Sequence, residues 1–336
     1  MRHGLLWGLA ALVVLGAAIV LFSVILPRPP EGGHSRAERG SPGEGKSSSV
    51  DVVPVEGVKK QVTEEEKTGK AKEVGKEQAS EEDAIYVRAL FAAMAKDFVG
   101  ELKHAQELVN RYPDHERSHV CLGDAYCGLG FWDDAIAAYK QAIKIRPDYT
   151  EAWNGLGNAY IGAKQFSEAI AVYKQAIKIK PDFAEAWFGL GNAYVNVKQY
   201  NEAIAAYQEA IKIKPDDAGL WSILGLCYGV AGQHVEEVDA YKQEIEVYKR
   251  AIKIEPEDAV LWNNLGVAYC KVGQYAEAIA ACKEAIKIKP DFGVAWSNLG
   301  ADYFLNGEKE KALDVLRELR KLDPAKAAEL EKLMGS

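Results

Sequence analysis

Residues 184–215 read AEAWFGLGNAYVNVKQYNEAIAAYQEAIKIKP, and this stretch decides the fold. Its apolar residues recur at spacings of three and four in two blocks, a pattern typical of two amphipathic helices. The residues expected on one face are Trp187, Leu190 and Tyr194 in the first helix and Ile204, Tyr207 and Ile211 in the second. Gly191 and Ala203 are small enough for the two helices to approach closely. Pro215 ends the second helix, and Asp216 or Asp217 can cap the next one.

The same pattern returns along the chain with an almost constant period. Prolines stand at positions 113, 147, 181, 215, 256, 290 and 324, at intervals of 34, 34, 34, 41, 34 and 34 residues. Tryptophans at 153, 187, 221, 262 and 296 follow the same rhythm. A fixed period in this range predicts a solenoid, in which each repeat packs only against its neighbours.

These repeats closely resemble the tetratricopeptide repeat family, whose signature is W-x-x-L-G-x-x-Y, then A-x-x-x-F/Y-x-x-A, then a proline. In one unit the signature residues are Trp153, Leu156, Gly157, Tyr160, Ala169, Tyr173, Ala176 and Pro181. The resemblance covers about three-quarters of the chain. It implies an all-α fold, a right-handed superhelix of helix pairs, and protein binding rather than catalysis.

The repeat period predicts where the parts of the chain begin and end. The expected parts are an anchor (1–26), a linker (27–81), a degenerate first repeat or cap (82–115), the solenoid (116–324) and a C-terminal capping helix (325–336). The solenoid units are 116–149, 150–183, 184–217, 218–258, 259–292 and 293–324. The unit 218–258 carries seven extra residues within Tyr241–Tyr248, which predicts a second helix about 10 Å longer that overhangs its neighbours. The insertion is either neutral or a dedicated contact site.

The N-terminal segment predicts a membrane anchor. Leu5–Leu26 is an uncharged run of 22 residues, about 33 Å long as a helix, which is enough to span a bilayer core. Residues 27–81 are rich in Pro, Gly and Ser and then in Lys and Glu, which predicts a disordered linker. The Lys and Arg count and the unpaired cysteines favour cytoplasmic repeats, but the basic N-terminus leaves the side of the membrane open.

Composition and two motif matches argue against catalysis and nucleic-acid binding. The net charge is −8, and residues 81–336 hold 30 Lys/Arg and 39 Asp/Glu, so no basic stripe is expected. Gly40–Ser47 matches a phosphate-binding loop, but its flanks are neither strand-like nor helical. His115–His119 matches H-E-x-x-H, but the repeat places His115 in a turn and His119 at the tryptophan position. We therefore expect no catalytic residues, no metal and no cofactor, and five free cysteines.

The family resemblance also implies where a partner would bind. First helices line the concave side of such a superhelix, and certain places in each unit contact ligands. The matching residues here are Asn154, Asn158, Phe188, Asn192, Asn196, Ser222, Asn263, Asn264, Ser297 and Asn298. Asparagine amides can donate to and accept from a peptide backbone whatever its sequence. Asparagine is also a common residue on any solvent-exposed groove. The sequence therefore leaves open whether these asparagines bind a partner or are simply exposed to solvent.

The sequence thus predicts a membrane-tethered, single-pass scaffold that binds a peptide or helix in its groove. One alternative is a structural protein that self-associates through its terminal repeats. The other is an enzyme that depends on a nucleotide or zinc through the two motif matches.

Overall fold

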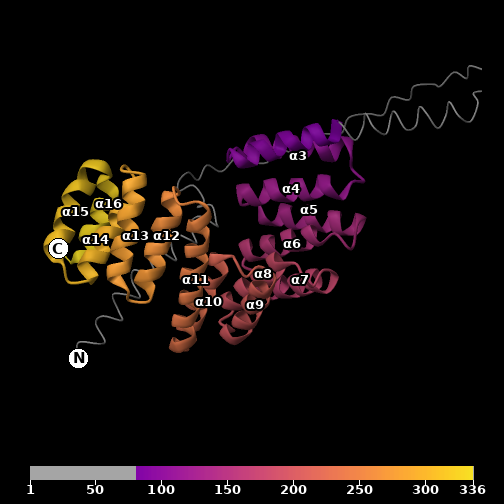
Figure 1. Ribbon diagram of the computed structural model, residues 1–336. Helices are drawn as coiled ribbons and strands as arrows, with labels where there is room; N and C mark the ends of the chain where they lie inside the picture. Colours follow the sequence, from indigo (N-terminus) through magenta and orange to yellow (C-terminus); the bar gives the residue numbers. More distant parts are fainter. Residues whose placement is uncertain (1–80, 336) are drawn as a thin grey trace, which may run out of the picture.

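The computed structural model describes residues 81–335, which form helices joined by short turns and contain no strand (Figure 1). The all-α prediction is confirmed. The first helices of the units are α4 (Glu116–Leu129), α6 (Thr150–Gly162), α8 (Ala184–Asn196), α10 (Ala218–Val230), α12 (Ala259–Lys271) and α14 (Gly293–Leu305). The second helices are α5 (Trp132–Ile145), α7 (Phe166–Ile179), α9 (Tyr200–Ile213), α11 (His234–Ile254), α13 (Tyr275–Ile288) and α15 (Lys309–Leu322).

Further helices cover the two ends of this array. Residues 81–94 and α3 (Phe98–Arg111) form a helix pair before α4, so residue 81 is helical and not part of the linker. At the other end α16 (Pro324–Met334) packs on α14 and α15. The predicted anchor, the linker up to residue 80 and the Gly40–Ser47 match lie outside the described residues. Between residues 81 and 335, no helix combines the length and the apolar character needed to span a membrane.

A hydrogen bond fixes the start of each unit. Trp153 Nε1 donates to the carbonyl oxygen of Pro147 at 2.8 Å. The same bond is formed by Trp187, Trp221, Trp262 and Trp296 with the prolines six residues before them. His119 Nε2 lies 2.8 Å from the Pro113 carbonyl oxygen, so it takes the tryptophan's place as expected. The bond holds the first helix against the turn that precedes it.

A buried tyrosine ring fills the centre of most units. Tyr173 is 1% exposed, and its ring lies between Gly157 of its own unit and Gly189 of the next. A Cβ atom on Gly157 would lie 2.5 Å from Tyr173 Cε1, which is too close for any other residue. Tyr139 lies between Gly123 and Gly155 in the same way, whereas Tyr207 contacts Gly191 of its own unit and the next unit carries Ile223 at the second glycine place. The glycines therefore let the first helices approach both neighbouring rings.

The first helices lie on the inner, concave side of the array. α4 contacts α6, α6 contacts α8 and α12 contacts α14, whereas no two second helices within residues 81–335 contact each other comparably. The contacts are weaker around α10, where Ile223 stands at the place held by Gly155 and Gly189 in earlier units. The array therefore curves, and its curvature changes at α10 (Figure 1). The right-handed sense of the superhelix stays a prediction.

The seven extra residues lengthen one helix but do not all overhang. α11 has 21 residues, against 14 in each of the other second helices from α5 to α15. Within the insertion, Glu244, Ile245 and Val247 are buried. Only the last turn projects, because Ile254 is 79% exposed whereas the equivalent Ile145 is 37% exposed. The helix is therefore seven residues longer, as predicted, and the burial of Glu244, Ile245 and Val247 shows that part of the insertion is packed instead of overhanging.

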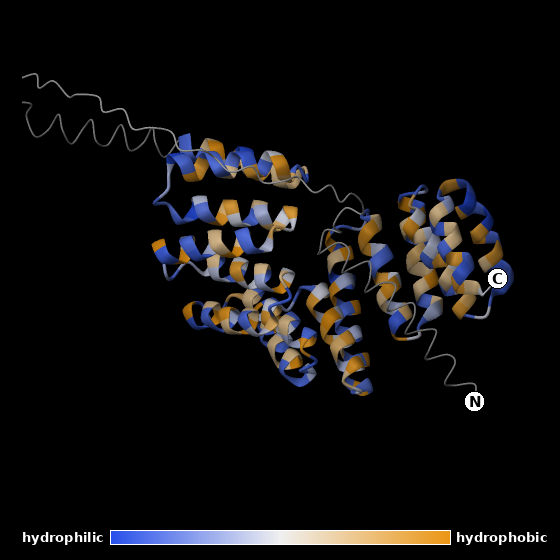
Figure 2. Cartoon of the chain, turned by 180° about the vertical axis from the view of Figure 1, so that it is seen from behind, coloured by the Kyte–Doolittle hydropathy of each residue, from blue (hydrophilic) through white to orange (hydrophobic). Residues whose placement is uncertain are grey.

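Hydrophilic residues gather in the loops at the edges of the array, and hydrophobic ones on the faces where helices meet (Figure 2). The buried core consists of several clusters, and α11 contributes to two of them. Ala240 belongs to one cluster with Tyr207, Leu224 and Tyr228. Ile245 and Ile252 belong to the next, with Leu265 and Ala268 of α12. α11 therefore contributes side chains to both of these clusters.

Candidate binding surface

Asparagines on the concave side are held in place by the core tyrosines. The Tyr173 hydroxyl donates to Asn158 Oδ1 at 2.6 Å, and the Tyr207 hydroxyl donates to Asn192 Oδ1 at 2.7 Å. Both bonds join residues 15 positions apart, from the first to the second helix of one unit. A side chain fixed through its oxygen keeps its Nδ2 group as a donor for a ligand. The bonds therefore orient these amides before any partner binds.

The remaining expected contacts in this half of the solenoid differ in access. Asn196 is exposed, and its Nδ2 donates to the Asn192 carbonyl oxygen at 2.9 Å. Asn154 is half-buried, and its Oδ1 is buried without a hydrogen-bond partner in the described chain. Phe188 is half-buried, with its ring tilted against Tyr207 at a centroid distance of 6.0 Å. This half of the surface offers amides around one aromatic ring.

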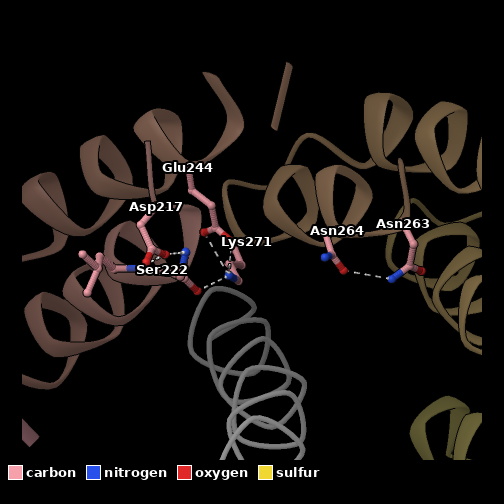
Figure 3. A network of polar contacts seen from close by, with 8 residues as sticks. Asp217, Ser222, Glu244, Asn263, Asn264 and Lys271 are labelled. Atoms are coloured by element: carbon pink, nitrogen blue, oxygen red, sulfur yellow. Dashed lines mark hydrogen bonds and ion pairs between the residues drawn. The ribbon is translucent and has the colours of Figure 1, made fainter. Parts of the chain in front are cut away.

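Ser222 belongs to a buried charged network instead (Figure 3). Lys271 Nζ on α12 donates to Ser222 Oγ on α10 at 2.7 Å and to both Glu244 carboxylate oxygens on α11 at 2.9 and 3.0 Å. The side chains of Lys271 and Glu244 are only 10% and 3% exposed. Burial raises the pKa of Glu244, whereas Lys271 favours its ionised form. These hydrogen bonds connect α10, α11 and α12 at the position of the insertion.

A second polar group joins α12 to α14. Asn298 Nδ2 donates to Asn263 Oδ1 at 2.9 Å, and Asn263 Nδ2 donates to Asn264 Oδ1 at 3.3 Å. Asn263 is 5% exposed and Ser222 is 6% exposed, so neither reaches a ligand directly. Asn264, Ser297 and Asn298 remain half-buried. The expected contacts thus form two groups, with the Lys271 network between them.

Apolar side chains lie on α10, between the two groups. Ile223 and Leu226 are half-buried, and Val230 is 63% exposed. Leu226 stands at the place that Asn158 and Asn192 hold in earlier units, so the surface changes from polar to apolar there. An apolar patch next to fixed amides can hold a peptide side chain while the amides bond its backbone.

The zinc motif does not assemble a metal site. His115 Nδ1 lies 2.8 Å from Glu82 Oε2, and His119 is bonded to the Pro113 carbonyl. No group of three metal-ligating side chains occurs in the part of the chain that the structure describes. All five cysteines are free, and burial beside Asp302 raises the pKa of the Cys282 thiol. A thiol kept protonated in this way is a poor nucleophile.

Sequence reasoning missed three contributors to this surface. Each tyrosine follows, by 15 positions in the sequence, the aspartate or asparagine to which its hydroxyl donates. This constant spacing could have revealed the hydrogen-bonded pairs. Glu244 stands at a place where other units carry alanine, such as Ala176 and Ala210. Lys271 is its one close cationic partner within residues 81–335. The signal available in the sequence was the charged Glu244 at a position where other units carry a small, buried alanine.

Three family models match the chain. The model described as the C-terminal domain of cilia and flagella-associated protein 70 matches residues 76–229. A tetratricopeptide repeat model matches residues 259–292, and a TPR repeat model matches residues 240–273. No curated protein sequence matches the chain.

Several solved structures are similar to this one. A crystal structure of MamA is 30% identical, covers 50% of this chain and 95% of its own, and gives a TM-score of 0.38. The APC/C hetero-tetramer Cut9-Hcn1 gives 18% identity, 73% and 48% coverage and a TM-score of 0.50. A tetratricopeptide repeat protein from Parabacteroides merdae gives 15% identity, 76% and 99% coverage and a TM-score of 0.48. The chain spans about half the length of the Cut9-Hcn1 match.

Proposed function

Because this chain belongs to the tetratricopeptide repeat family, we propose that it is a scaffold that binds a protein partner on its concave side. The partner segment is a peptide or a helix that lies across the first helices. No chemical step is involved: binding buries the segment and releases it unchanged.

The orientation of the Asn158 and Asn192 amides carries this proposal. Each Oδ1 is occupied by a tyrosine hydroxyl, so each Nδ2 group can donate to a carbonyl oxygen of an extended backbone. An amide that is already ordered loses less side-chain entropy on binding. Sequence-independent backbone bonds would give affinity, and the apolar side chains would select the partner.

Selectivity is expected from Phe188 and from Ile223, Leu226 and Val230. These side chains are partly exposed and lie on α8 and α10, the first helices of two successive units. The Lys271–Glu244 pair is neutralised and buried, so it positions α10 and α12 instead of contacting the partner. The proposed ligand is therefore a segment with an apolar side chain and an accessible backbone.

We also propose that a helix over Leu5–Leu26 tethers the scaffold to a membrane. Support comes from the sequence alone, since 22 uncharged residues suffice to span a bilayer. Carbonate extraction of native membranes tests the tether, because an integral protein stays in the pellet. Replacing Leu12 and Ile19 by Arg should release it to the supernatant, and protease protection reports the side of the repeats.

A photo-cross-linking amino acid at position 188 of the full chain tests the concave surface in intact cells. We expect an adduct with a partner segment, and we expect Asn158→Ala with Asn192→Ala to reduce its yield about tenfold or more, since two backbone hydrogen bonds are lost. Asn201→Ala on the outer helix α9 is the matched control and should leave the yield unchanged. An equal adduct from a probe at Lys174 on α7 would refute the concave surface as the site.

A further inference from the structure

The first helix of the array carries an apolar stripe on its outer side. Val87, Leu90, Phe91 and Met94, which we name the N-terminal stripe, are 44%, 44%, 67% and 80% exposed. Their spacing of three, one and three residues places them on one face of the helix at 81–94. Scattered exposed apolar residues need no explanation, but four on one face form a patch.

The opposite side of this helix is firmly held by the rest of the chain. Ile85 and Ala89 are buried in a cluster with residues of α3 and α4. Three acids in the first turn also contact later residues: Glu81 and Asp83 form ion pairs with Arg111 and Arg117, and Glu82 Oε2 lies 2.8 Å from His115 Nδ1. These contacts fix the rotation of the helix, so the N-terminal stripe cannot turn inward.

The helix that covers the C-terminal end of the array has a polar outer face. α16 covers the last unit with Ala327 and Leu330, and Leu330 packs against Gly300. Its remaining surface carries Lys326, Glu329 and Lys332. A terminal element with a polar outer face is what a solenoid needs to stay soluble. The helix at 81–94 occupies the corresponding place at the N-terminal end (Figure 1), but its outer face is apolar.

We infer that the N-terminal stripe binds the same stripe of a second copy of this chain, forming a two-fold symmetric pair. Apolar residues at this spacing form the seam of paired helices, and a two-fold axis brings identical patches together. Glu81 and Asp83 near the stripe are already paired with Arg111 and Arg117, and Glu82 lies against His115, so these acids do not stand as unpaired like charges between two copies. The pairing leaves both concave surfaces free.

Two other occupants fit the observations less well. Residues 59–80, which lead into the helix, contain only Val62, Ala71, Val74 and Ala79 as apolar residues, too few to cover the stripe. A lipid surface fits amphipathic helices with Lys and Arg on their polar side. Here Glu81, Glu82 and Asp83 flank the stripe, against the single Arg88. A second copy offers an apolar surface of matching length.

Photo-cross-linking of the full chain in native membranes identifies the occupant. With the probe at Phe91, we expect a covalent dimer whose cross-linked peptide includes residues 87–94 of the other copy. The probe at Val235 on α11, which is 73% exposed, is the matched control and should give no dimer. A cross-link from position 91 to residues 1–80 of the same chain, to lipid or to another protein would overturn the inference.

Sedimentation of the full chain in detergent provides a second, independent measurement. We expect Phe91→Glu with Met94→Glu to raise the dimer dissociation constant about 100-fold or more, because it places charge in an apolar seam. Val235→Glu with Ile254→Glu introduces the same charge on exposed apolar positions of α11 and should leave it unchanged. Circular dichroism must show equal helix content in all variants. A monomeric wild-type chain, or a Phe91→Glu/Met94→Glu dimer of unchanged affinity, would refute the pairing.

Discussion

At the scale of single residues, the tyrosine in the middle of α5, α7, α9 and α11 joins the core to the concave surface. Its ring packs on glycines, and its hydroxyl bonds Asp124, Asn158 or Asn192 in three successive units. In the next unit Leu226 stands at the asparagine position, and the Tyr241 hydroxyl is buried without a partner in the described chain. An unsatisfied buried hydroxyl is destabilising.

This contrast predicts opposite effects for the same substitution. Tyr207→Phe loses a hydrogen bond and should lower the free energy of unfolding by about 1 kcal/mol. Tyr241→Phe removes an unpaired buried hydroxyl and should be neutral or stabilising by up to about 1 kcal/mol. Thermal unfolding of both variants measures the difference. A larger loss for Tyr241→Phe than for Tyr207→Phe would show that the Tyr241 hydroxyl is satisfied in solution.

Asp302 predicts a pH dependence of stability. It is 2% exposed, and burial raises its pKa from 3.8 to about 7, although the Cys282 thiol donates to it at 3.5 Å. The folded state therefore binds the proton more tightly than the unfolded state does. The stability that this group supports is greatest below pH 3.8 and is lost as the pH rises to about 7.

Asp302→Asn removes this titration. Its stability advantage over the wild type should grow by about 2–3 kcal/mol between pH 5 and pH 8 and then level off. Chemical denaturation at pH 5, 6.5 and 8 measures it. Asp291→Asn, at an exposed aspartate, is the control and should show no such growth. A constant difference across this range would mean that Asp302 is ionised throughout.

The repeat period predicted the roles of some single residues but not the burial of others. The 34-residue period correctly placed His119 at the tryptophan position and limited the helix cap to Asp216 or Asp217, of which Asp217 is the cap, since its Oδ1 accepts from Gly219 and Leu220. Periodicity could not reveal that Ser222 and Asn263 are buried. Their burial depends on Lys271 and Asn298, which lie 49 and 35 residues away in the sequence.

At the scale of elements, the turn between the two helices of a unit imposes a left-handed backbone at one place. Gly130, Gly232, Gly273 and Gly307 adopt it with φ between 76° and 83°. Lys164 and Lys198 stand at the same place with φ of 60° and 61°. Glycine adopts this conformation without strain, whereas a residue with a Cβ atom does not.

Lys198→Gly should therefore stabilise the protein by about 0.5–1 kcal/mol, since strain relief exceeds the entropy that glycine adds to the unfolded chain. Lys198 is exposed, so no packing is lost. Gln175→Gly, at an exposed position within α7, is the matched control and should cost about 1 kcal/mol. Thermal unfolding midpoints report both changes. Equal losses from the two substitutions would show that the turn relaxes in solution.

At the scale of the whole molecule, local sequence predicted the helix pairs but not how the helices before and after α11 are placed relative to each other. The helix bounds follow the repeat closely, because each pair is specified by its own apolar pattern and its proline. The burial of the α11 extension depends instead on the surfaces that α10 and α12 present to it. Glu244 and Lys271 meet only because the insertion places a carboxylate between those helices.

Deleting residues 242–248 tests whether the insertion sets this relative placement. The deletion joins Tyr241 to Lys249 and restores the sequence AYKRAIKIEP, which matches the other units and keeps the 34-residue period. It also removes Glu244, so Lys271→Asn should accompany it, as Asn196 holds that place in an earlier unit. We expect the variant to fold, because each remaining helix keeps its apolar face.

In this deletion variant, the distance between spin labels at Asn196 on α8 and Asn306 after α14 should shift by several Å, up to about 10 Å, since seven residues of helix are removed. Labels at Lys164 and Lys198 lie in the half before the insertion, so their separation should stay constant. Lys271→Asn without the deletion is the second control and should leave both distances unchanged. If the first distance does not move, the extra turns are absorbed locally. The helices before and after α11 would then be positioned by the packing of α11 against α10 and α12, not by the length of α11.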